Sequence, residues 1–85
     1  MLNLSFDAKN DILYIKINDM HNSYGDEIEN GLVVFYDMDD ESITGVTIFD
    51  FIKRLNEGKM KHLKLPCSID IEKDVLPEVE KIIMN

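Results

Sequence analysis

Apolar and polar residues alternate in short segments of the first 48 residues, and this spacing of two predicts β-strands. The expected strands cover residues 2–6, 12–18, 32–36 and 43–48, with a weaker edge strand at 26–29. Polar stretches at 7–11, 19–25 and 37–41 separate them and are typical of turns and loops. Such an order predicts a small antiparallel β-meander of three to five strands. Because β-branched and aromatic residues dominate 32–36, we expect that strand to be the central and most buried one.

The spacing of apolar residues becomes helical after residue 48. A short helix is expected at 50–57, where Gly58 would end it, and a second at 74–84, with Pro77 in its first turn. One apolar stripe of the second helix consists of Val75, Leu76, Val79, Ile82 and Ile83. We expect this stripe to pack on its own sheet, although a partner could also cover it. The sequence thus predicts one α+β domain over 1–85, with the sheet in 1–48 and helical or extended structure in 49–85.

Length and composition favour a small globular protein that gains stability by self-association. A chain of 85 residues buries only a thin core, and small domains without disulfides often oligomerise. The single cysteine, Cys67, excludes an intrachain disulfide, which suits a reducing compartment. The N-terminus lacks the pattern of a signal peptide, and the longest apolar run is too short to span a bilayer. We therefore expect a cytoplasmic homodimer or small oligomer without membrane contact.

Charge is distributed unevenly along the chain. Residues 1–52 contain 11 acidic and 2 basic residues, a net charge of −9, whereas residues 53–85 carry +1. An acidic sheet repels the phosphate backbone, so nucleic-acid binding is disfavoured, even though five basic residues lie between 53 and 64. A basic protein partner fits this charge better. The carboxylates expected to face such a partner are Asp26, Glu27, Glu29, Asp37, Asp39, Asp40 and Glu41.

The sequence contains no recognisable motif for catalysis, metal binding or cofactor binding. The acidic stretch that begins at Asp37 resembles a calcium loop, but Ser42 and Ile48 occupy the positions where that loop needs glycine and glutamate. His21, His62 and Cys67 lack the paired spacing of zinc ligands. Nucleotide-binding glycine loops do not occur. We therefore expect no catalytic residues, no cofactor and no metal.

The segment from about 6 to 52 resembles domain-of-unknown-function family 2283, a group of small prokaryotic domains. The positions that carry this resemblance are Asp7, Asp11, Leu13, Tyr14, Ile15, Gly31, Tyr36, Asp37, Gly45 and Ile48. The resemblance implies a small antiparallel sheet followed by a helix. It also implies an antitoxin-like partner role, because some relatives are encoded beside small toxin-like proteins. The residues after Arg54 are not covered by it.

Two functional hypotheses follow. The first is a non-catalytic protein–protein interaction module whose acidic surface steers a basic partner. The alternative is a small enzyme or ligand-binding protein with a site at a subunit interface. Its candidate groups would be Cys67, His62 and the acidic hairpin tip at 37–41.

Overall fold

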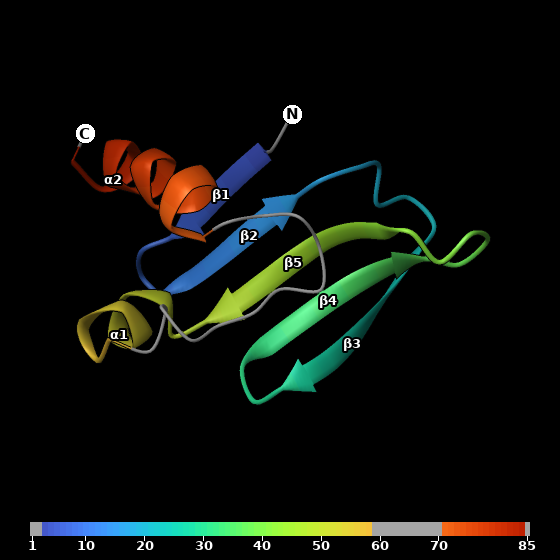
Figure 1. Ribbon diagram of the computed structural model, residues 1–85, viewed down its shortest axis with the longest axis horizontal. Helices are drawn as coiled ribbons and strands as arrows, with labels where there is room; N and C mark the ends of the chain where they lie inside the picture. The colour runs from blue at the N-terminus through green and yellow to red at the C-terminus, as the bar shows by residue number, and fades with distance from the viewer. Residues whose placement is uncertain (1–2, 59–70, 85) are drawn as a thin grey trace.

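The computed structural model describes residues 3–58 and 71–84 as five strands and two helices (Figure 1). The strands are β1 (Asn3–Asp7), β2 (Ile12–Lys16), β3 (Ser23–Glu29), β4 (Leu32–Asp37) and β5 (Ile43–Phe49). They are followed by α1 (Phe51–Asn56) and by a π-helical turn, η2 (Ile71–Val75), which continues into α2 (Leu76–Met84). The expected antiparallel sheet with a short helix and a C-terminal helix is confirmed. No helix in these two ranges is long and apolar enough to cross a membrane.

The strand order differs from the expected meander. It is β1-β2-β5-β4-β3, all antiparallel, so the chain leaves β2 for the far edge of the sheet and returns through β4 to β5. The central strand is therefore β5, in which residues 44–48 are all buried, and the expectation for 32–36 was wrong. An apolar run shows that a strand is covered, but the pairing partners decide which strand lies in the middle.

The segment 19–25, expected to be a loop, is part of the sheet from Ser23 onward. Ser23, Tyr24 and Gly25 pair with the C-terminal half of β4. The side chain of Ser23 also lies 2.8 Å from that of Thr44, measured between the two hydroxyl oxygens. Polar composition did not prevent strand formation here because β4 supplies backbone partners to an edge strand that needs little burial.

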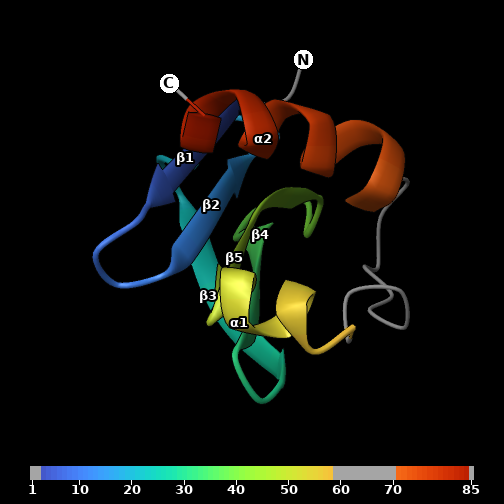
Figure 2. The same ribbon diagram turned by 90° about the vertical axis from the view of Figure 1, so that its left-hand side faces the viewer.

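One face of the sheet carries the hydrophobic core. Leu13 and Ile15 of β2 are two residues apart and lie on this face, where both are buried. The core also contains Leu32, Val34, Val46 and Ile48 from the sheet, and Phe51, Val75 and Val79 from the helical part. Both helices lie over this face in the side view (Figure 2). The stripe expected on the C-terminal helix thus packs on its own sheet at Val75 and Val79.

Gly45 lies beside an irregularity in the pairing of β5 with β4. The pairing of β4 with β5 shifts between Phe35 and Tyr36, which is the sign of a β-bulge. A Cβ atom on Gly45 would lie only 2.9 Å from the carbonyl oxygen of Ile15. Glycine therefore allows β2 and β5 to approach closely at this point.

Candidate interaction surface

The most exposed strand of the sheet is β3. It lies at the edge of the sheet and pairs only with β4 among the described strands. All of its residues except Ser23 are exposed, including the large apolar side chains of Tyr24 (42%) and Ile28 (41%). At the opposite edge, β1 has α2 packed against it. The β3 edge thus combines an exposed backbone, exposed apolar side chains and carboxylates.

The pairing with β4 assigns the β3 side chains to the two faces of the sheet. Asp26 lies opposite the buried Val34, so it shares the helix-bearing face with Tyr24. Glu27 lies opposite Val33 and projects from the other face. The rings of Tyr24 and Tyr36 lie 5.7 Å apart between centroids, so one side of Tyr24 is packed while the rest faces solvent.

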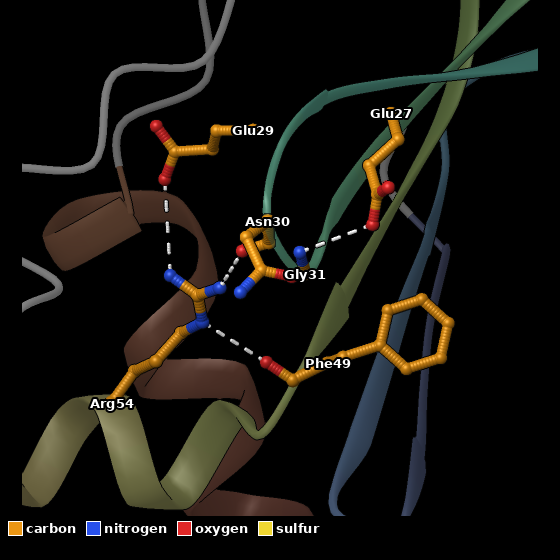
Figure 3. A network of polar contacts seen from close by, with 6 residues as sticks. All are labelled: Glu27, Glu29, Asn30, Gly31, Phe49 and Arg54. Carbon is orange, nitrogen blue, oxygen red and sulfur yellow. Dashed lines mark hydrogen bonds and ion pairs between the residues drawn. The ribbon is translucent and has the colours of Figure 1, made fainter.

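Arg54 of α1 holds the turn between β3 and β4 in place (Figure 3). Its Nε donates a hydrogen bond to the carbonyl oxygen of Phe49 at 3.0 Å, and its Nη2 donates to that of Asn30. Its Nη1 lies 3.8 Å from Oε1 of Glu29, and the Arg54 side chain is 18% exposed. This guanidinium therefore joins the end of β5 to the turn and partly neutralises Glu29.

Glycine is needed at the centre of this turn. Gly31 has a φ of +84°, and a Cβ atom there would collide with Nη2 of Arg54. Its N–H donates to Oε2 of Glu27 at 3.3 Å, and its carbonyl accepts from the N–H of Phe49 at 2.8 Å. The turn is thus fixed by backbone conformation as well as by charge.

The acidic residues of the β4–β5 loop are largely used to shape that loop. Oδ1 of Asp37 accepts from the N–H groups of Asp39 at 2.8 Å and Asp40 at 3.2 Å. Oδ1 of Asp40 accepts from the N–H of Ser42 at 2.8 Å. The pKa of Asp40 is lowered mainly by a hydrogen bond with the side chain of Ser42 and, to a smaller extent, by the one from its backbone N–H. These contacts are those of Asx turns.

The seven carboxylates expected to face a partner therefore form two groups. Asp26, Glu27 and Glu29 lie on β3, while Asp37, Asp39, Asp40 and Glu41 lie at or beyond the end of β4 that pairs with Ser23. The length of β3 separates Glu29 from this loop by about 20 Å. On β3, Asp26 is the residue whose carboxylate makes no hydrogen bond or ion pair in the described structure, as is Glu41 in the loop, so both are free to bind a partner.

Asp11 has a role that the sequence analysis missed. Its carboxylate accepts hydrogen bonds from the N–H groups of Ile52 at 2.7 Å and Lys53 at 3.1 Å, and so caps α1 from the β1–β2 turn. Asp50, which directly precedes the helix, makes no side-chain cap. A local search for helix caps could not find this contact, because the two partners are 41 residues apart in sequence.

The groups considered for catalysis are not assembled in the described part of the chain. His62 and Cys67 lie outside the described residues. His21 is exposed in a loop, where its N–H donates to Asp19. Within residues 3–58 and 71–84, no three histidine, cysteine or acidic residues are placed to hold a metal ion.

Two shallow cavities are lined by described residues. One, of about 320 Å³, is polar and is lined by Asn30, Asp50, Lys53, Arg54 and Glu57. The guanidinium of Arg54 already donates hydrogen bonds to backbone carbonyls of the protein itself. The other, of about 370 Å³, lies over β1 and β2 beside Tyr14 and Met20. Neither brings together groups that suit acid–base or nucleophilic catalysis.

Comparisons with family models, curated proteins and solved structures found no match for this chain. The resemblance to domain-of-unknown-function family 2283 therefore stays a prediction from the sequence.

Proposed function

We propose that this protein is a non-catalytic interaction module whose acidic surface binds a basic partner protein. The observation that supports this most directly is the β3 edge, where exposed carboxylates and exposed apolar side chains occur on one strand. Charge steers a partner of opposite sign toward such a surface, and apolar contact then holds it. The antitoxin-like role and the cytoplasmic location are part of this proposal and rest on the sequence alone.

Self-association is a second part of the proposal. On the sheet face opposite the helices, Tyr14 of β2 (43% exposed) and Phe49 of the central strand β5 (39%) are exposed in the described structure. A homodimer or small oligomer would protect such side chains in a protein with a thin core. Analytical ultracentrifugation over a range of concentrations tests this, and a monomer at every concentration would contradict it.

Capture of partners from a lysate of the source cells tests the binding function. The bait would be the tagged wild-type protein, with the Asp26→Lys variant as the matched comparison. We expect one stoichiometric basic protein at low salt, which is lost at high salt because the contact is electrostatic. We also expect the variant to capture less of it. An identical set of proteins on both baits, unaffected by salt, would count against an acidic binding surface.

A further inference from the structure

The outer edge of β3 has backbone groups that are available for pairing. In an antiparallel pair, the N–H and C=O groups of every second residue point to the neighbouring strand, and the others point away. Since β3 pairs only with β4 in the described structure, its outward groups find no strand there. With seven residues, β3 is as long as the central strand β5.

The usual protections of a sheet edge are largely missing from β3. Natural edges are short, contain lysine or proline, or are distorted by bulges. The segment from Ser23 to Glu29 contains neither lysine nor proline, and its one register shift lies near its end, between Glu27 and Glu29. What remains is negative charge, which opposes pairing with a second copy of the same strand, since like charges opposite each other are destabilising. A strand that carries positive charge meets no such barrier.

We infer that the outer edge of β3 accepts a basic extended segment of another protein, which adds to the sheet as a further strand. This inference rests on the proposed binding function and names its contact. Backbone hydrogen bonds would supply affinity, and the side chains of β3 would supply specificity.

The two faces of β3 specify the sequence that fits. Tyr24 and Asp26 lie on the helix-bearing face, while Glu27 lies on the other. Side chains directly opposite each other on paired strands lie about 5 Å apart. An added antiparallel strand would therefore carry lysine or arginine opposite Glu27 and Asp26, and an apolar side chain opposite Tyr24. Read along that strand, the pattern is basic, basic, any residue, apolar.

Arg54 occupies the end of β3 next to the turn, so the proposed recognition involves the residues before it. It partly neutralises Glu29 and holds the β3–β4 turn, so Asp26 and Glu27 remain as the recognition carboxylates. Glu27 accepts no hydrogen bond from Arg54, and only its Oε2 accepts one from the N–H of Gly31. Its other oxygen is available to a cation.

A set of synthetic peptides tests the inference without knowledge of the natural partner. The probe is a peptide of about seven residues, Thr-Val-Arg-Lys-Thr-Val-Thr, with both ends blocked. Two further peptides carry N-methyl groups on alternate residues, one on the odd positions and one on the even positions. Because only one of these sets of N–H groups can face β3, we expect one methylated peptide to bind about tenfold more weakly or worse, and the other to bind nearly as well as the parent.

The binding site would be located by amide chemical shifts and hydrogen exchange of the full-length protein. We expect the amides of β3 to become protected when the parent peptide binds. Asp26→Lys should weaken binding about tenfold. Glu41→Lys makes the same change of charge in the β4–β5 loop and should change binding little.

The outcomes separate this inference from the broader proposal. Equal binding of all three peptides, with shifts confined to 37–41, would overturn pairing at β3 and leave an acidic binding module in place. Peptides that perturb no residue of β3 would also overturn it, whatever partner the capture experiment finds. Weaker binding of only one of the two methylated peptides than of the parent, together with protection of the β3 amides, would establish strand addition.

Discussion

Asp11 shows how a single side chain can join two distant parts of a small domain. It has a φ of 55°, and from the β1–β2 turn its carboxylate accepts two N–H groups at the start of α1. Its carbonyl oxygen also accepts from the N–H of Phe51 at 3.1 Å. The first turn of the helix is therefore satisfied by the sheet.

We expect Asp11→Ala to lower the free energy of unfolding by about 1–2 kcal/mol, the usual value of a lost helix cap. Asp11→Asn should cost less, because asparagine tolerates the left-handed conformation and keeps one acceptor oxygen. Urea unfolding measures both. Asp26→Asn, at an exposed carboxylate without a bond, serves as the control and should change stability by less than about 0.5 kcal/mol. Equal effects at Asp11 and Asp26 would show that the cap contributes nothing.

Gly31 is constrained both by its own backbone conformation and by the nearby side chain of Arg54. We expect Gly31→Ala to destabilise the protein by at least about 1 kcal/mol, because its φ is positive and the new Cβ atom meets the guanidinium. Gly58→Ala is the matched control, since Gly58 has a φ of +73° but no atom within 4 Å of the added Cβ. In an Arg54→Ala background the two alanine substitutions should cost the same. A Gly31 cost that stays larger there would place the strain elsewhere.

Two exposed carboxyl groups should titrate below their ordinary pKa of 3.8. For Asp7 the main cause is the hydrogen bond from the side chain of Asn10, followed by that from its backbone, and for Asp40 it is Ser42. Because the pKa is lower in the folded state, each group's stabilisation is present above the ordinary pKa and is lost as pH falls through the lowered value.

Carboxyl NMR titration measures these two values directly. We expect Asn10→Ala to raise the pKa of Asp7 toward 3.8 and to leave that of Asp40 unchanged. Equal shifts at both aspartates would point to overall charge as the cause.

At the scale of elements, the C-terminal helix belongs to the core of the sheet that precedes it. Val75 and Val79 are fully buried among side chains of the strands and α1. The ring of Phe51 in α1 also lies edge-on to that of Phe6 in β1, with centroids 6.1 Å apart. The helical part therefore covers the apolar face of the sheet and completes the core. Packing of this kind stabilises a small sheet.

We expect Val79→Ala to reduce the free energy of unfolding by about 2 kcal/mol, from the lost burial of two methyl groups and the cavity left behind. Glu80→Ala, next to it on the exposed side of α2, should have a small effect. Chemical denaturation compares the two. An unchanged midpoint for Val79→Ala would mean that α2 contributes little to the core and is available to a partner.

For the molecule as a whole, the excess of negative charge opposes the compact state. The formal net charge is −8, and exposed ion pairs such as Arg54–Glu29 and Lys81–Glu78 offset little of it. We expect added sodium chloride to raise the melting temperature by a few degrees, since screening weakens repulsion between exposed carboxylates. Differential scanning calorimetry at several salt concentrations tests this. Neutralising Asp26 and Glu41 together by amide substitution should reduce the effect of salt, and a melting temperature that falls with salt would contradict the repulsion.

The sequence by itself determined most of the strands and helices of this fold, because local spacing sets them. The alternation around Leu13 and Ile15 identified a half-buried strand, and Gly58 marked a helix end. The excess of acidic residues in 1–52 also led to the prediction of an acidic binding surface. Each of these signals depends on residues that are near neighbours in the chain.

Only the tertiary structure decided the strand order and the role of individual carboxylates. Composition could not show that β5, rather than 32–36, is central, because pairing between distant strands depends on the whole sheet. Nor could it separate Asp11, which caps a helix 41 residues away, from Asp26, which has no bond in the described structure. The two aspartates cannot be distinguished by their neighbours in the sequence. The three-dimensional path of the chain decides which groups each carboxylate contacts.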